Sequence, residues 1–197
     1  MVSHRLSLLM SLLPSILLLV APVTPAGAEP SLSLETDPAT FLFDGYSLHF
    51  RFSLPESAPN WVFGAGIYAM DLPDPLRKMV ITNADRDLDI TLKHGYGLFS
   101  EYYLRSDYQG WFIGGQLGIT QFELHNPSKG PDANYTTLLI MPRIGYRWVP
   151  FQNGFYLLPW AGIGYAPLLS GGTAVGERSY HRSGILPFAT LHLGYQF

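Results

Sequence analysis

The sequence predicts an all-β protein, an eight-stranded antiparallel transmembrane up-and-down β-barrel. Two observations predict this class. Segments in which every second residue is apolar recur along the chain, and turn-rich connectors separate them. The composition is also unusual for a water-soluble domain, because charged residues make up only 14% and aromatic residues also reach 14%, with 20 glycines.

The first 28 residues have the pattern of a secretory signal peptide. A short basic start containing Arg5 precedes an apolar run over 8–20, and Ala26-Gly27-Ala28 matches a small-x-small cleavage site. We therefore expect one mature domain over 29–197. Beyond this leader no apolar run is long enough for a spanning helix, so a mature chain that enters a membrane must do so as a closed sheet.

Seven segments alternate clearly and an eighth, the first, is weaker. In 46–54, leucine and aromatic residues occupy one face, and Ser47, His49, Arg51 and Ser53 occupy the other. Eight strands of roughly ten residues suit a small barrel that spans a bilayer. In chain order, the expected strands are 29–36, 46–54, 61–70, 88–104, 111–123, 135–148, 155–165 and 185–197.

The connectors between these segments alternate in length. If the last strand ends at the inner face, the long connectors face outward and the short ones face inward, as in known membrane barrels. An odd number of strands would break this alternation. The long connectors are 71–87, 125–134 and 166–185, and the short ones are 55–60, 106–110 and 149–153.

The last strand carries a recognisable motif. Leu191, Leu193, Tyr195 and Phe197 occupy every second position, with Phe197 as the final residue. This strand resembles the assembly signal of the small outer-membrane β-barrel superfamily. The resemblance implies a place in the outer membrane of a Gram-negative-type cell and contact with membrane lipid and lipopolysaccharide. It also implies recognition by the barrel-assembly machinery through the strand that ends at Phe197.

The faces opposite the apolar stripes predict a polar cluster in the lumen. Eight strands leave a lumen just wide enough for side chains, and an unpaired charge there is costly. We therefore expect a lumen filled by side chains, in which Glu101 pairs with Arg143, Arg51 or Lys93. A narrow channel or a solute-binding barrel remains an alternative. The predicted cluster consists of His49, Arg51, Lys93, Glu101, Arg143 and His192.

One loop permits an enzymatic alternative. His181 and Ser183 form a His-x-Ser pair that resembles the pair of outer-membrane lipid A deacylases, in which histidine activates serine for attack on an ester. The chain departs from that family because Gly184 stands where the family has asparagine, and no acidic residue follows Glu177. The primary prediction is therefore a non-enzymatic protein, structural or surface-binding through its extracellular loops.

Several classes of function lack support in the sequence. The chain has no cysteine, which excludes disulfides and thiol ligands, and His49 and His192 are a weak metal pair. A net charge of −3 does not favour nucleic acid binding. We predict no metal and no cofactor. A soluble periplasmic barrel of the lipocalin type is a further alternative to the membrane barrel.

Overall fold

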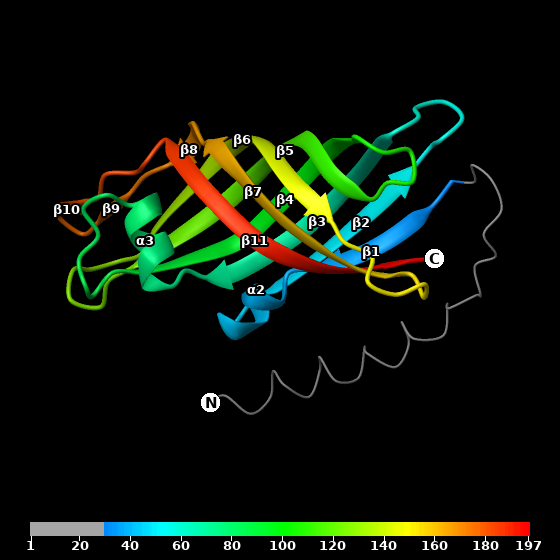
Figure 1. Ribbon diagram of the computed structural model, residues 1–197. Helices are drawn as coiled ribbons and strands as arrows, with labels where there is room; N and C mark the ends of the chain where they lie inside the picture. The colour runs from blue at the N-terminus through cyan, green and yellow to red at the C-terminus, as the bar shows by residue number, and fades with distance from the viewer. Residues whose placement is uncertain (1–29) are drawn as a thin grey trace.

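The computed structural model describes residues 30–197, which form a closed eight-stranded antiparallel β-barrel (Figure 1). The predicted eight-stranded up-and-down architecture is confirmed, whereas the predicted leader, 1–28, lies outside the described residues. Each strand pairs with its neighbour in sequence, and the barrel closes between the first strand and the last. The strands are β1 (Leu32–Thr36), β2 (Tyr46–Ser53), β3 (Trp61–Asp71), β4 (Asp89–Tyr103), β5 (Gly110–His125), β6 (Ala133–Arg147), β7 (Phe155–Tyr165) and β11 (Ile185–Gln196).

Three further strands lie in the connector between β7 and β11. β8 (Leu168–Gly171) continues the line of β7 along β6. β9 (Ala174–Val175) and β10 (Arg178–Ser179) form a small separate hairpin. These strands lie at the end of the barrel that carries the long connectors 72–88, 126–132 and 166–184, and we call it the loop end. We call the opposite end, which carries the short connectors, the turn end.

Two short helices sit in connectors at the loop-end side of the strands. Asp37 caps α2 (Pro38–Leu42) by accepting a hydrogen bond of 2.9 Å from the Ala39 amide, and Pro38 occupies a first-turn position that needs no amide hydrogen. α3 (Asp74–Val80) is fastened by Arg77, which pairs with Asp74 and donates to the Leu88 carbonyl. Within residues 30–197, no helix is both long and apolar enough to cross a membrane.

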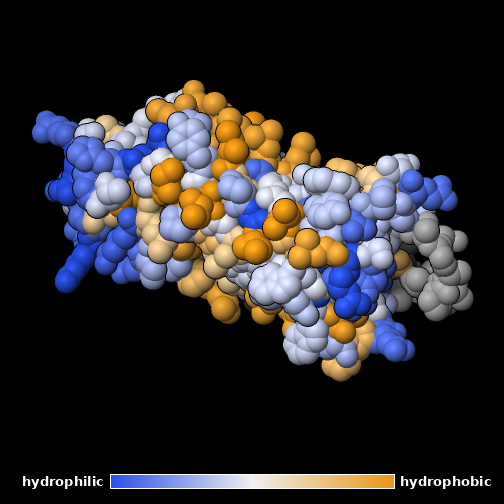
Figure 2. All heavy atoms as spheres, turned by 45° about the horizontal axis from the view of Figure 1, so that its top comes forward, coloured by the Kyte–Doolittle hydropathy of each residue, from blue (hydrophilic) through white to orange (hydrophobic). Residues whose placement is uncertain are grey.

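Around its middle the barrel is apolar outside, and inside it buries charged and polar side chains beside apolar ones. Strand residues alternate between exposed and buried positions, so that Leu98, Leu117 and Ile163 point outward while Arg51 and Glu101 are buried in the lumen. Figure 2 shows hydrophobic residues gathered over the middle of the molecule. This distribution is the reverse of the one that a water-soluble sheet adopts.

At the loop end, apolar side chains face inward and polar ones face outward, as in a water-soluble protein. Ile90, Phe122 and Tyr135 face inward and belong to a buried apolar cluster, which we call the loop-end cluster, while Thr91 and Glu123 lie on the outer face. Figure 2 shows hydrophilic residues at this end. The loop-end cluster consists of Val80, Ile81, Leu88, Ile90, Leu92, Phe122, Leu124, Ala133, Tyr135, Val175 and Tyr180.

In β4, a β-bulge moves the apolar side chains from the outer face in the middle of the barrel to the inner face at the loop end. Leu92 pairs with Phe122 and His94 pairs with Gln121, so Lys93 is one extra residue in the strand. One added residue moves every side chain beyond it to the opposite face. The predicted place of Lys93 in the lumen is therefore wrong: its ammonium lies on the outer face, 2.9 Å from a carboxylate oxygen of Glu123.

Deletion of Lys93 should destabilise the loop end. Without the extra residue, Ile90 and Leu92 would turn outward, and burial of such side chains contributes ~1.5–3 kcal/mol each. We expect a loss of roughly 3–6 kcal/mol in the free energy of unfolding, measured with urea. Lys93→Ala keeps the residue count and removes only an exposed ion pair, so it should cost less than ~1 kcal/mol. Equal stability of the two variants would contradict the role of the bulge.

Candidate functional site

A network of buried charges crosses the lumen. Glu101 accepts hydrogen bonds from both Arg51 and Arg143, and Arg51 Nε lies 2.6 Å from Glu35 Oε1. The Tyr156 hydroxyl donates to the same Glu35 oxygen over 2.7 Å. Two carboxylates therefore balance two guanidinium groups, which is the condition for burying such charges.

His192 extends the network in a defined tautomer. The Trp160 indole Nε1 donates to His192 Nε2 over 3.1 Å, and His192 Nδ1 lies 3.0 Å from Glu35 Oε2. Because an indole nitrogen can only donate, Nε2 is the acceptor and Nδ1 carries the hydrogen that Glu35 receives.

Aromatic rings fill the space around the guanidinium groups. Arg51 and Arg143 each lie 4.5 Å from the centroid of the Phe99 ring, and Arg143 lies 5.0 Å from that of Trp160. Towards the turn end, Arg147 lies 3.8 Å from the ring centroid of Tyr156. Such contacts strengthen when they are removed from water. The network and these rings lie together in the middle of the lumen.

The structure brings five of the six predicted lumen residues together. Arg51, Glu101 and Arg143 make the ion pairs, His192 joins through Glu35, and the His49 ring packs against the His192 ring in a tilted arrangement with centroids 4.6 Å apart. Lys93 lies on the outer face, as described above. No hydrogen-bond partner for His49 Nδ1 occurs in the described part of the chain.

Sequence reasoning missed Glu35, which links the two halves of the network. The residue lies in β1, whose alternation is weak because the strand is short. Its signal is nevertheless present, since Ser33 and Glu35 occupy alternate positions and both are buried. The two predicted lumen arginines, Arg51 and Arg143, also need a second anion beside Glu101, and Glu35 is an acid at an inward position.

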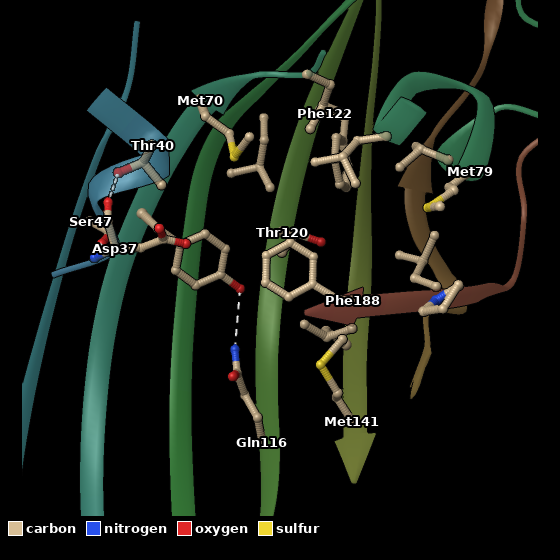
Figure 3. Close-up of a pocket in the computed structure, with 18 of the residues that line it drawn as sticks. Asp37, Thr40, Ser47, Met70, Met79, Gln116, Thr120, Phe122, Met141 and Phe188 are labelled. Atoms are coloured by element: carbon tan, nitrogen blue, oxygen red, sulfur yellow. Dashed lines mark hydrogen bonds between the residues drawn. The ribbon is translucent and has the colours of Figure 1, made fainter. Parts of the chain in front are cut away.

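A cavity lies between the charge network and the loop-end cluster. It measures about 130 Å³, counted as the space open to the centre of a water molecule. In Figure 3, Thr40 of α2 and Met79 of α3 lie on opposite sides of this cavity, and Phe188 of β11 lies between them. Its apolar wall includes Met70, Leu92, Phe122, Leu139, Met141 and Phe188, and its floor includes His49, Gln116 and His192.

The barrel wall beside this cavity is interrupted. β11 pairs with β7 from Ile185 to Tyr195, but it pairs with β1 only from Leu193 to Gln196, because β1 ends at Thr36. Beyond that point the edge of β11 faces no strand. We call this gap the lateral window. It is bordered by β11, α2, α3 and the end of β3, and α2 is tied to β11 by the Thr190 hydroxyl, which donates to Asp37 over 2.6 Å.

The cavity reaches the outside of the barrel at the lateral window. Inward side chains such as Phe122 and Met141 line its deep part, whereas Met79 and Pro187 line it at the window and are themselves exposed. Pro187 suits this edge because it has no amide hydrogen to leave unpaired. The loop-end cluster covers the cavity on one side and the charge network on the other, so its opening is lateral.

The candidate hydrolytic pair does not form a catalytic arrangement. The Ser183 hydroxyl donates to the Ile185 carbonyl over 2.7 Å, and the His181 side chain is exposed. Among residues 30–197, no hydrogen bond joins His181 to Ser183 or to Glu177. In the same residues, no group of three or more histidine, aspartate and glutamate side chains is placed to hold a metal ion.

Comparisons with models of known protein families, with curated protein sequences and with solved structures found no match for this chain. Functional inference therefore rests on the fold, the charge network and the cavity.

Replacing Glu101 with glutamine should strongly destabilise the barrel. The substitution keeps the shape of the side chain but leaves two buried guanidinium groups with one carboxylate, and breaking a buried pair in this way costs about 3–5 kcal/mol. Glu123→Gln is the matched control, since it breaks the partly exposed pair with Lys93 and should cost about 0–1 kcal/mol. The measurement is the free energy of unfolding in urea, and similar values for both variants would show that the network contributes little to stability.

Proposed function

We propose that this protein is a non-enzymatic outer-membrane β-barrel that does not conduct ions. The observation that carries the proposal is the reversal of polarity along the barrel. Around the middle, apolar side chains point outward and charged ones inward, whereas at the loop end the arrangement is that of a soluble protein. If the middle of the barrel lies in hydrocarbon and the loop end lies in water, both arrangements of side chains are explained.

Aromatic pairs at the turn end support this placement. Trp61 packs edge-on against Tyr102 with ring centroids 5.4 Å apart, and Trp111 packs in the same manner against Tyr146 at 5.3 Å. All four side chains are exposed on the outer face. Tyrosine and tryptophan favour the boundary between lipid and water, so these pairs are suited to a girdle at the inner interface.

The charge network argues against conduction. Its members satisfy one another's charges, and Phe99, Trp160 and Tyr156 occupy the space between them. An ion crossing the lumen would have to break these buried pairs. We therefore assign the protein a structural or binding role, carried out through the loop end and the embedded surface. Its partners in this proposal are membrane lipid and lipopolysaccharide. The assembly machinery would recognise β11, the strand that leads to Phe197.

An arginine at the middle of the outer face tests the membrane location. Leu117→Arg places a charge where we expect hydrocarbon and should cost about 2–4 kcal/mol in lipid vesicles. Gln121→Arg is the control, because Gln121 lies on the same face of β5 near the loop end, where the cost should be about 0–1 kcal/mol. If both variants are as stable as the parent, or if the protein fractionates as a soluble protein, the proposed location is wrong.

Conductance measurements test the closed lumen. The purified protein, inserted in a planar lipid bilayer, should give no discrete current steps, because the paired charges and the rings beside them lie across the route an ion would take. A general porin inserted in the same bilayer provides the positive control. Reproducible steps that change size in Glu101→Gln would favour a narrow channel through the network instead.

A further inference from the structure

We propose that the lateral window admits one hydrocarbon chain of a neighbouring membrane lipid into the cavity. The proposal rests on the membrane location proposed above and adds a ligand class and an entry route to it. The structure supplies four arguments: what surrounds the window, how the cavity is closed, how large it is, and which charge lies at its rim.

The surface around the window is suited to contact with hydrocarbon. Phe41 and Leu42 of α2 project outward, with Leu42 80% exposed, and Ile185 and Leu191 of β11 are exposed on the outer face. These residues lie at the height of the apolar belt rather than at the hydrophilic loop end. In a membrane, the medium that meets the window is therefore the acyl-chain region of the bilayer.

The cavity is closed to water at both ends of the barrel. The loop-end cluster lies above it, with Val80, Leu92 and Phe122 shared between the cluster and the cavity wall. The charge network lies below it, with Gln116 and His192 in the floor. A ligand from the bilayer has a direct path, whereas a ligand from the aqueous phase must pass a packed apolar layer or break ion pairs.

The size and composition of the cavity suit a single chain. Its 130 Å³ is close to that of an engineered apolar cavity of about 150 Å³ that holds one benzene molecule. It can therefore take part of one chain and not a whole lipid. Met70, Met79 and Met141 line it, and their flexible thioethers adapt to a chain of variable conformation.

The thermodynamic gain comes from filling space. An acyl chain that moves sideways from the bilayer exchanges one apolar environment for another, so hydration contributes little. The wall of an empty cavity, however, lacks van der Waals partners, and a chain supplies them. Lys78 is exposed on α3 beside Met79, where its ammonium can meet the phosphate of a lipid whose chain occupies the window.

Tryptophan quenching by brominated lipid tests the proposal. The chain contains four tryptophans, of which Trp160 lines the cavity and the other three lie exposed on the outer face. A variant with Trp61→Phe, Trp111→Phe and Trp148→Phe leaves Trp160 as the sole emitter. Folded into phosphatidylcholine vesicles with bromine at mid-chain, this variant should lose Trp160 emission relative to non-brominated vesicles.

Two matched variants separate entry from quenching through the wall. Adding Leu139→Phe and Met141→Phe to the Trp160-only protein fills the cavity and leaves the outer face unchanged, so the quenching should fall. Far-UV circular dichroism confirms folding, and Met141→Phe alone is used if the double substitution does not fold. The lipid-facing reference is Ile163→Trp in a background in which all four native tryptophans, Trp160 included, are phenylalanine, since Ile163 is 61% exposed on β7.

The outcomes distinguish this proposal from the one on which it rests. Quenching of the reference together with Trp160, and its loss in the filled cavity, supports chain entry. Quenching of the reference alone, or equal quenching of Trp160 with the cavity filled, overturns entry and leaves the membrane location intact. Absence of quenching at the reference overturns the membrane location itself. Quenching of Trp160 only by brominated stearate added from solution identifies a free amphiphile and overturns the lipid source.

Discussion

The pairing of Glu35 and Glu101 with Arg51 and Arg143 is the interaction on which the interior of this barrel depends. These residues come from β1, β2, β4 and β6, so the network joins strands that do not all touch one another in the sheet. With apolar side chains turned outward, the middle of the lumen holds these buried charges beside a second buried apolar cluster that includes Phe112, Met141 and Leu158. Charge pairing and cation–π contacts hold the polar part of this interior together, and they require that no member be missing.

The reversal of polarity gives the molecule two different interiors in one sheet. The loop-end cluster packs like the core of a soluble protein, whereas the middle combines the charge network with a second buried apolar cluster inside an apolar outer surface. β5 passes through both zones with unbroken alternation, since Gln116, Thr120, Phe122 and Leu124 all face inward. Only the kinds of residue change along it. β4 reaches the same result with a bulge, which shows that pairing register and side-chain chemistry must agree across neighbouring strands.

Much of the fold could be predicted from the sequence, because period-two alternation is strong in the long strands and their ranges follow directly from it. The bulge at Lys93 could not be read in this way, since the strand looks equally regular in either phase. Glu35 was missed because β1 is too short to show a convincing pattern. The lateral window exists because β1 is much shorter than its neighbour β11. It could not be predicted from the sequence, because it depends on the pairing register between these two strands.

The short β1 has a physical cost that the structure partly offsets. In the membrane location proposed above, an unpaired strand edge leaves backbone groups without partners, and each such group is expensive in hydrocarbon. β11 limits this cost at its open edge with Pro187, which has no amide hydrogen, and through the bond from Thr190 to Asp37 that seats α2 against it. A full-length β1 would remove the cost entirely, and a barrel with only a structural role would gain by it. The interruption of the wall therefore points to a use for the opening, and the apolar cavity directly behind it is the feature of the described structure that such an opening serves.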